Sequence, residues 1–169
     1  DTIISSLKNL SRKPSFEVNE KMALNKTIQE ALLLINKLFE KEEIKINLNL
    51  SENELYSPCN NNLMTQVITN LALNARDAMK NSKTKIIEII TENKEQKNYI
   101  IFRDTGTGFD ETIINKIFEP FFTTKEVGEG VGLGLTICYD IIKSFNGNIY
   151  ANNADSGGAQ FTIELPIYK

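Results

Sequence analysis

Polar side chains recur at helical spacing along residues 63–80 and could serve hydrogen-bonding or ligand chemistry. At about 100° per residue they fall within a narrow band beside a broad apolar face; they are Gln66, Asn70, Asn74, Asp77 and Asn81. Asparagine is unfavourable inside a helix because its side chain competes for backbone hydrogen bonds. The stripe is therefore either a set of satisfied or solvated amides or one wall of a binding site.

A second candidate is the segment DTGTGFD at residues 104–110, directly after an expected strand. Gly106 and Gly108 allow a ligand to approach the backbone closely, and Asp104 can accept hydrogen bonds from an amino group. Alone, the segment is equally compatible with a glycine turn in which Asp104 caps backbone amides.

A third candidate is GEGVGLGL at residues 128–135, directly before an expected helix. Gly130, Gly132 and Gly134 leave backbone N–H groups bare at a helix N-terminus, where the helix dipole favours phosphate. The segment is neither a Walker loop, which needs GK[ST], nor a Rossmann fingerprint. It predicts phosphate binding, with a flexible hinge as the alternative.

Between them, IFEPFFTTK at residues 117–125 combines three phenylalanines with Thr123, Thr124 and Lys125. Phe118, Phe121 and Phe122 can anchor the segment to the core, cover a planar ligand or dock onto a partner. Lys125 can reach a phosphate group.

The elements that must position these residues follow from periodicity and turn signals. Helices are expected at about 25–42, capped by Asn25, at 63–80, capped from Asn60 to Asn62, at 133–145 and, briefly, at 111–118. Strands are expected at 44–50, before Pro58, at 85–92 and 99–104 around the turn NKEQKN, and at 149–153 and 160–165 around the turn 155–158. This order predicts a two-layer α/β sandwich, with a mixed, largely antiparallel sheet and helices on one face. The helices at 63–80 and 133–145 would then lie side by side and border a cleft.

Composition narrows the classes of function. A formal net charge of −3 and the absence of any long apolar run give no sign of nucleic-acid binding or membrane contact. Cys59 and Cys138 have no metal-like spacing, and with no signal-peptide pattern they predict a cytoplasmic protein with reduced thiols. The sequence contains no histidine, which excludes histidine bases, ligands and acceptors within it.

Four motifs in order, LMTQVITNLALNARDAM, DTGTGFD, IFEPFFTTK and GEGVGLGLTI, followed by GGAQFTIELP, resemble the N, G1, F and G2 boxes of sensor histidine kinases. The resemblance is to their catalytic ATP-binding domain, of the gyrase, heat-shock chaperone, histidine kinase and mismatch-repair superfamily, and covers about 16–166. It implies a Bergerat-type ATP-binding fold over 14–169. The segment LKNLSRK resembles the end of a dimerisation and phosphoacceptor helix, so residues 1–13 are expected to be its remnant.

The resemblance also implies roles for individual residues. Asn74, with Asn70 one turn earlier, would hold Mg²⁺ against the phosphates of ATP, since Mg²⁺ prefers hard oxygen ligands. Asp104 would accept the adenine amino group, and Gly106 and Gly108 would line the base and sugar. The remaining expected nucleotide contacts are Asp77, Phe118, Phe122, Thr124, Lys125, Gly130, Gly132, Leu133 and Gly134.

Position 70 bears on the type of reaction. In the chaperone and gyrase branches the corresponding residue is a glutamate that activates water, whereas Asn70 cannot be a general base. The resemblance therefore implies phosphoryl transfer to a protein rather than fast hydrolysis. Two departures from the family pattern are Gln66, where an acidic residue or histidine is common, and Val131, where a hydroxyl is frequent.

The expected partners are ATP, a phosphoacceptor domain of the same homodimeric kinase, and the receiver domain of a response regulator. Because the sequence lacks histidine, the acceptor would lie upstream, in a parent that is membrane-anchored or soluble. Two alternatives stay open: a stand-alone kinase or ATPase such as an anti-sigma-factor serine kinase, and a nucleotide-binding interaction module without catalysis.

Overall fold

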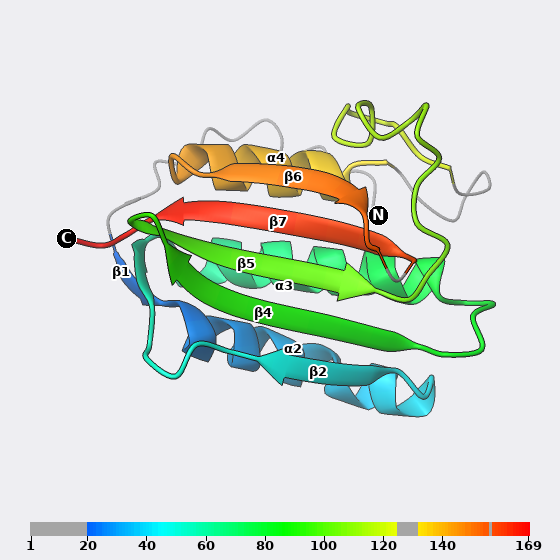
Figure 1. The fold of residues 1–169 in the computed structure, drawn as a ribbon, viewed down its shortest axis with the longest axis horizontal. Coiled ribbons are helices and arrows are strands. Elements are labelled where there is room, and N and C mark those ends of the chain that lie inside the picture. The colour runs from blue at the N-terminus through cyan, green and yellow to red at the C-terminus, as the bar shows by residue number, and fades with distance from the viewer. Residues whose placement is uncertain (1–19, 125–131, 156) are drawn as a thin grey trace, which may run out of the picture.

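The computed structural model describes residues 20–124, 132–155 and 157–169. Within these ranges three helices cover one face of a five-stranded sheet (Figure 1). The helices are α2 (Leu24–Lys41), α3 (Asn61–Ala78) and α4 (Gly134–Ser144). The strands of this sheet are β2 (Lys45–Asn49), β4 (Ile86–Lys94), β5 (Lys97–Asp104), β6 (Asn148–Asn153) and β7 (Ala159–Pro166).

The sheet has the order β2-β4-β5-β7-β6, with β2 parallel to β4 and all other neighbours antiparallel. A small antiparallel pair, β1 (Lys21–Ala23) and β3 (Tyr56–Pro58), lies beside α2. The predicted two-layer sandwich with a mixed, largely antiparallel sheet is therefore confirmed. None of the helices in the described ranges has the length and apolarity that crossing a bilayer would need.

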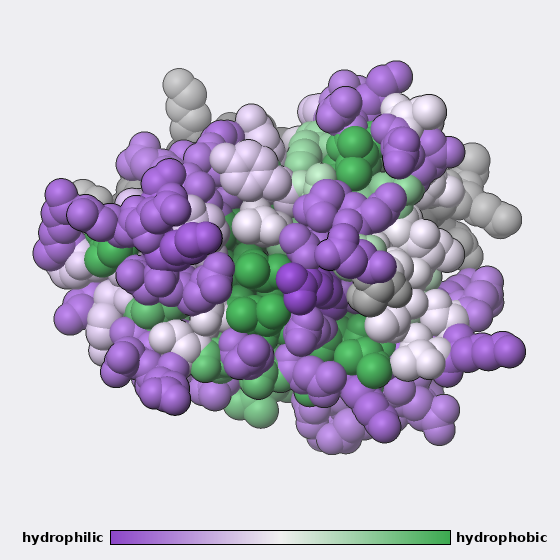
Figure 2. Space-filling model, in the orientation of Figure 1, coloured by the Kyte–Doolittle hydropathy of each residue, from purple (hydrophilic) through white to green (hydrophobic). Residues whose placement is uncertain are grey.

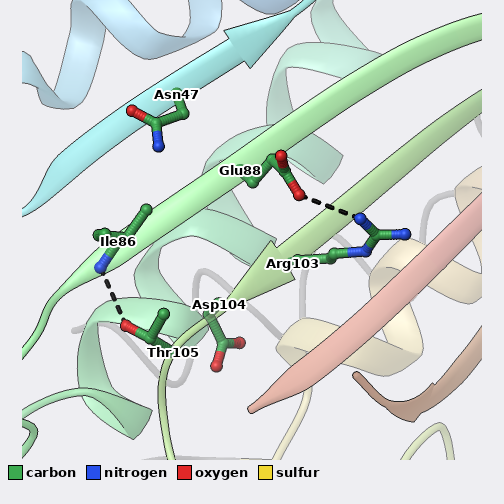
Figure 3. A pocket seen from close by; sticks show the side chains of 6 residues that line it. All are labelled: Asn47, Ile86, Glu88, Arg103, Asp104 and Thr105. Atoms are coloured by element: carbon green, nitrogen blue, oxygen red, sulfur yellow. Dashed lines mark hydrogen bonds and ion pairs between the residues drawn. The ribbon is translucent and has the colours of Figure 1, made fainter. Parts of the chain in front are cut away.

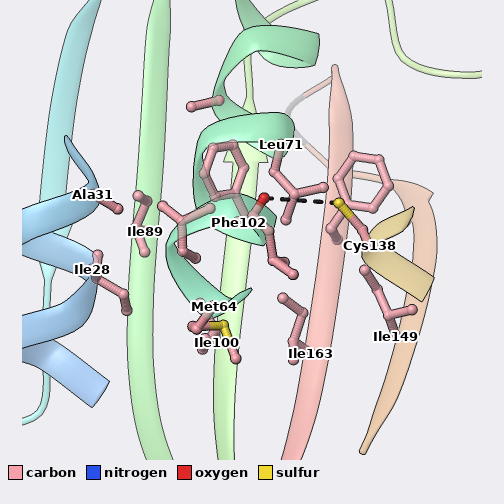
Figure 4. Packing of buried hydrophobic residues seen from close by; sticks show 14 of the residues in the cluster. Ile28, Ala31, Met64, Leu71, Ile89, Ile100, Phe102, Cys138, Ile149 and Ile163 are labelled. Atoms are coloured by element: carbon pink, nitrogen blue, oxygen red, sulfur yellow. Dashed lines mark hydrogen bonds between the residues drawn. The ribbon is translucent and has the colours of Figure 1, made fainter. Parts of the chain in front are cut away.

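The core lies between the two layers, where alternate sheet residues meet the apolar stripes of the helices (Figure 4). Met64, Ile68 and Leu71 of α3 are fully buried against Ile100 and Phe102 of β5. A buried leucine or phenylalanine of this kind stabilises the fold by roughly 1.5–3 kcal/mol. The polar stripe of α3 is on the flank toward α4, so the core holds the stripe at the surface of the helical layer.

The first helix begins differently from the prediction. Asn25 is not its N-cap: α2 starts at Leu24 after Ala23, which makes no side-chain cap. The carboxylate of Glu54 instead accepts hydrogen bonds from the backbone N–H groups of Asn25 and Lys26, at 2.8 and 3.3 Å. Because Glu54 caps the helix, the Asn25 side chain does not have to. It is buried and accepts a hydrogen bond from the Thr91 hydroxyl. In α3, by contrast, Asn60 Oδ1 accepts from Leu63 N, as the sequence predicts.

Three further expectations are corrected. The segment 111–118 is a run of turns rather than a helix, because its backbone hydrogen bonds link residues three apart, from Ile113 to Asp110 and from Lys116 to Ile113. The turn expected at NKEQKN contracts to Glu95 and Gln96, both with positive φ, as a two-residue hairpin requires. Leu48 is 43% exposed, because β2 is an edge strand and does not bury one full face.

The other face of the sheet is open (Figure 2). It is mostly hydrophilic, with some apolar surface near its middle. By the alternation of burial along β4 and β5, the cross-strand pair Ile90 and Ile101 belongs to this face. The helical face carries the core and, at the ends of α3 and α4, the described parts of the connection from β5 to α4, residues 105–124 and 132–133.

Candidate functional site

A cleft of about 1240 Å³ lies between α3, α4 and the connection that joins β5 to α4. All four motifs contribute residues to its wall. Those of the DTGTGFD segment are Thr107, Gly108 and Phe109. The residues of the expected site that line it are Asn70, Asn74, Asp77, Gly108, Phe122, Thr124, Gly132, Leu133 and Gly134. Segments far apart in the sequence therefore meet at one place.

The asparagine stripe of α3 faces the N-terminus of α4 across this cleft. The Asn70 amide nitrogen donates to the carbonyl oxygen of Gly134 at 3.4 Å. The Asn70 side chain also forms a hydrogen bond with the buried thiol of Cys138. Burial raises the pKa of Cys138 to about 12, and the hydrogen bond with Asn70 lowers it by less. With its nitrogen turned to α4, the Asn70 amide oxygen has no hydrogen bond from the described residues and can face a ligand.

Gly134 is the first residue of α4 and leaves open space in front of Asn74. Apart from its chain neighbours and its own helix, a Cβ at Gly134 would meet among the described residues only Asn74 Nδ2, at 4.0 Å. The N-cap residue Leu133 makes no side-chain cap. Among the described residues the first backbone N–H groups of α4 thus have no acceptor, and they lie beside a gap bordered by an amide, which suits an anion with a bound cation.

Asp104, at the end of β5, is buried with only 4% of its surface exposed. Its Oδ1 accepts hydrogen bonds from the N–H groups of Gly106, at 2.8 Å, and Ala159, at 3.2 Å. Burial raises the pKa of Asp104, and these two hydrogen bonds partly offset the effect. Within the described residues both bonds end on Oδ1, so Oδ2 is available to an amino group.

Asp104 and Gly106 do not themselves line the cleft. They lie directly behind it, because a Cβ at Gly106 would be 2.8 Å from both Asp104 Oδ1 and the Cβ of Ala78, a cleft residue. Ala78 is small, so the close approach of this loop to α3 depends on a glycine facing an alanine.

Asp104 also borders a second, smaller hollow, of about 200 Å³, on the open face of the sheet (Figure 3). Three of its polar residues are engaged with protein partners: Arg103 binds Glu88 at 3.0 Å and Gln160 at 2.6 Å, and Thr105 accepts from the Ile86 N–H. The larger cleft, with its uncovered groups, is therefore the candidate site.

The end of β6 and the turn that follows it support the DTGTGFD loop. The sequence alone did not reveal this support. Asn153 accepts from Phe109 N at 2.7 Å and donates to Phe109 O at 2.9 Å. Gly158, with φ of +84°, packs so closely on Asp104 that a Cβ would lie 2.0 Å from its carbonyl oxygen. The turn signal at 155–158 was visible, but its contact with Asp104 depends on the pairing of β5 with β7.

The aromatic motif divides between the core and the cleft. Phe118 packs on Tyr139 and Phe161, with ring centroids at 5.6 and 6.5 Å, and is not among the cleft residues. Phe122 and Thr124 do line the cleft. Lys125 and Gly130, both expected to contact phosphate, lie outside the described residues, as does Val131.

Two basic residues outside the polar stripe also line the cleft, Arg76 and Lys80. Arg76 is held by its neighbour, since its Nε and Nη2 donate to Asp77 Oδ1 at 2.8 and 2.6 Å. Side chains at adjacent helical positions ordinarily diverge, so this pairing draws the guanidinium toward the flank occupied by Asp77.

The donor set fits Mg²⁺ carried by a polyphosphate. Among the described residues no three histidine, cysteine or acidic side chains gather into a metal site. The amide oxygens of Asn70 and Asn74 are hard ligands, and Mg²⁺ commonly completes its octahedron with phosphate oxygens and water. The site therefore combines an acceptor for an amino group, the Asp104 carboxylate behind the cleft wall, with the side-chain amides of α3 and the backbone N–H groups at the start of α4.

Comparison with known proteins identifies the family. Residues 59–169 match the family described as "Histidine kinase-, DNA gyrase B-, and HSP90-like ATPase". The chain is 31% identical over 166 residues to sporulation kinase A of Bacillus subtilis, covering 98% of this chain and 27% of that protein. It is 45% identical over 114 residues to the sensor kinase CckA of Brucella abortus, covering 60% of this chain and 12% of that protein. The chain thus spans well under half of these relatives.

The fold agrees with the sequence relationship. A nucleotide-free catalytic domain of the histidine kinase ThkA superposes with a TM-score of 0.78 at 31% identity, covering 88% of this chain and 95% of that one. A structure of ThkA in complex with the response regulator protein TrrA gives 0.77 at 27% identity, covering 98% and 46% of the two chains. The chain therefore belongs to the histidine kinase-, DNA gyrase B- and HSP90-like ATPase family, an ATP-binding family, and has the Bergerat fold of a histidine kinase catalytic domain.

Proposed function

We propose that this chain is the ATP-binding catalytic domain of a two-component sensor histidine kinase. It binds Mg·ATP and donates the γ-phosphate to a histidine of a separate helical phosphoacceptor domain, from which an aspartate of a response regulator receives it. The observation that carries the proposal is the gap between Gly134 and Asn74, at the end of a cleft backed by the available Oδ2 of Asp104.

The adenine is positioned by Asp104. Its carboxylate is fixed by the Gly106 and Ala159 amides on Oδ1, so Oδ2 accepts the exocyclic amino group without reorganisation. Ala78 and Gly108 leave space for the base and sugar beside the cleft wall. This buried, charge-assisted hydrogen bond favours adenine over a base with a carbonyl oxygen at the same position.

The phosphates are held at the opposite end by α3 and α4. The uncovered N–H groups at the start of α4 bind phosphate oxygens, and Asn74 and Asn70 would hold Mg²⁺ through their amide oxygens. When bound, the ion neutralises charge on the transferring phosphoryl group. Arg76, positioned by Asp77, adds positive charge to the same cleft.

The protein contribution to catalysis is positioning and charge stabilisation, which phosphoryl transfer mainly requires. An imidazole nitrogen of the acceptor forms a bond to the γ-phosphorus as the bond to the departing ADP oxygen breaks, and the imidazole proton passes to solvent. Asn70 provides no base for water. The ThkA–TrrA complex is named as a histidine kinase with a response regulator protein, and this relative supports the relay step.

Transfer of ³²P from γ-labelled ATP tests the proposal. The chain has no histidine, so alone it should incorporate no acid-labile, base-stable phosphate. Added to the phosphoacceptor domain of its kinase, produced separately as a homodimer, it should label that domain on histidine. Tight Mg·ATP binding with no transfer would instead favour an interaction module, and labelling of a serine would favour a serine kinase.

A further inference from the structure

Gln66 is the first residue of the polar stripe of α3, and the proposed site does not use it. It lies four residues before Asn70 and eight before Asn74, so the three side chains project from one face of the helix. Like the two asparagines, Gln66 lines the cleft. Its side chain is half-buried, and in the described part of the chain no hydrogen bond reaches its amide; the Thr69 hydroxyl bonds its backbone carbonyl instead, at 3.1 Å. The amide is therefore available to a ligand.

The contacts between α3 and α4 show where Gln66 lies relative to the phosphate end of the cleft. The Asn70 amide nitrogen meets the carbonyl oxygen of Gly134, the first residue of α4. The Cys138 thiol, further along α4, donates to the carbonyl oxygen of Val67 at 3.9 Å. The two helices are therefore antiparallel, and the cleft continues from the start of α4 between them as far as Gln66.

Gln66 provides the polar side chain in this stretch of the cleft. The described α4 residues that line the cleft after Gly134 are apolar, namely Leu135 and Ile137. Within α3, which is described throughout, no other residue before Asn70 lines it. A glutamine amide offers two N–H donors as well as an acceptor oxygen. An anionic group bound here would thus find its side-chain hydrogen bond at Gln66.

The direction of the nucleotide in the proposed site leads to the terminal phosphate. The base lies beside Ala78, in front of Asp104, and the phosphates that carry the ion lie at Asn74 and Asn70. ATP therefore runs along α3 toward the N-terminus of the helix, and the γ-phosphoryl group, which is furthest from the base, comes last. Successive residues of the stripe are about 6 Å apart along the helix axis, whereas a magnesium–oxygen contact is about 2 Å long. A phosphoryl group bound to the ion therefore fits between Asn70 and Gln66.

We propose that the side-chain amide of Gln66 donates a hydrogen bond to the γ-phosphoryl group of ATP and thereby orients this group for transfer. The inference rests on the proposed function and adds to it a residue that contacts the transferred group. In-line transfer places the attacking nitrogen and the departing ADP oxygen at opposite ends of the group, so its three equatorial oxygens face sideways. Because α3 lies along the side of the nucleotide, Gln66 can contact one of these oxygens without obstructing the acceptor.

The contact distinguishes ATP from ADP. The last phosphate of ADP is the β-phosphate, which lies at the asparagines and does not extend to Gln66. Only ATP therefore gains the hydrogen bond, and transfer of the γ-phosphoryl group removes it. A glutamine amide is also neutral and cannot act as a base, so Gln66 holds the phosphoryl group without taking the proton of the acceptor.

Calorimetric titration of this chain with Mg·ATP and with Mg·ADP tests the proposal, with Gln66→Ala as the variant. The Kd for Mg·ATP should rise about tenfold, as for loss of one hydrogen bond to a charged group, while the Kd for Mg·ADP stays within about twofold of wild type. Alanine favours the helix, so the variant should remain folded, which its Tm checks. Gln29→Ala is the matched control, because Gln29 is an exposed glutamine of α2 that does not line the cleft; it should change neither Kd.

A second variant separates the hydrogen bond from the size of the side chain. Gln66→Glu keeps the length of glutamine but replaces the N–H donor with a negatively charged acceptor, so it should weaken Mg·ATP more than Gln66→Ala does. Gln29→Glu controls for the added charge. Equal weakening of Mg·ATP and Mg·ADP would overturn the proposal, because Gln66 would then not act through the γ-phosphoryl group. So would an unchanged Kd for Mg·ATP in Gln66→Ala. Absence of Mg·ATP binding by the wild-type chain would contradict the proposed function instead.

Discussion

The side chain of Asn70 is bonded to the first residue of α4, with its amide nitrogen 3.4 Å from the carbonyl oxygen of Gly134. This contact sets the separation between the asparagine stripe and the uncovered N-terminus of α4. One turn further along α3, Asn74 faces the gap in front of Gly134. The two asparagines therefore differ: Asn70 also joins two elements through its amide nitrogen, whereas the Asn74 side chain borders the gap.

Replacing Asn74 should remove Mg-dependent nucleotide binding without destabilising the protein. Asn74→Ala deletes an amide oxygen proposed as a magnesium ligand, and alanine is the better helix former. Calorimetric titration with ATP should show no magnesium-dependent affinity, while the Tm stays at or above that of wild type. Asn36→Ala is the control: Asn36 lies on the exposed side of α2, where its side chain donates to Glu40, and this variant should bind as wild type. Wild-type affinity in Asn74→Ala would remove Asn74 from the site.

Replacing Asp104 with asparagine should weaken adenine recognition while preserving the fold. Asparagine can still accept from the Gly106 and Ala159 amides, but the charge-assisted bond to the adenine amino group is lost, at about 1–3 kcal/mol. Since burial raises the pKa of Asp104, the charged carboxylate costs stability at neutral pH, and the variant should be as stable as wild type or more so. ATP titration and thermal unfolding of the same samples measure the two effects.

The raised pKa of Asp104 should make ATP binding depend on pH. Below its folded pKa, Asp104 is protonated and donates where it should accept, so affinity for ATP should fall with acidity, starting at a higher pH than an ordinary aspartate would give. The stability contribution has the opposite sign: the cost of burying the charge is present above the folded pKa and is relieved as pH falls through it. Asp104→Asn should lack this part of the pH dependence of binding. An identical profile in both proteins would contradict the assignment.

The sequence predicted the three long helices, because apolar spacing alone sets which face of a helix such as α3 is buried. It also predicted that the asparagine stripe would face a cleft, since the 133–145 helix had to pack beside α3. It missed what supports Asp104. Asn153 and Gly158 are about fifty residues away, and only the pairing of Arg103 with Gln160 in β5 and β7 brings their turn onto the loop.

Local signals failed where long-range contacts supplied the missing groups. Asn25 has the residue type of an N-cap, but Glu54 takes that role and leaves Asn25 to bond Thr91. The 111–118 segment has helical apolar spacing, yet Asp110 bonds the hydroxyl and amide of Thr112 and starts a series of turns. Ile117 is nevertheless buried as the spacing suggests, so periodicity identified the buried residue but not the backbone that carries it.

The two glycines flanking Leu133 should respond oppositely to alanine. At Gly134 a Cβ meets only Asn74 Nδ2, at 4.0 Å, so Gly134→Ala should keep or raise the Tm but weaken ATP binding by filling the gap. At Gly132, φ is +70° and a Cβ would clash with the Phe121 backbone at 2.6 Å. Gly132→Ala should therefore destabilise the protein by about 1–3 kcal/mol. Denaturant unfolding and ATP titration of both variants measure the two effects. Wild-type stability of Gly132→Ala would contradict the close contact between Gly132 and the Phe121 backbone.

The last prediction concerns the fate of the phosphoryl group. Asn70→Glu introduces a carboxylate that can act as a base toward water, where the amide cannot. It also replaces an N–H donor facing the Gly134 carbonyl with a second acceptor, so it should destabilise the α3–α4 contact by about 1–3 kcal/mol. Among the molecules that remain folded and bind ATP, the ratio of free phosphate released to phosphohistidine formed should rise. Asn70→Gln, which keeps an amide but moves it by one methylene, controls for displacement and should lower both rates together. If Asn70→Glu left the ratio at the wild-type value, the residue at position 70 would not determine whether water or the protein receives the phosphate.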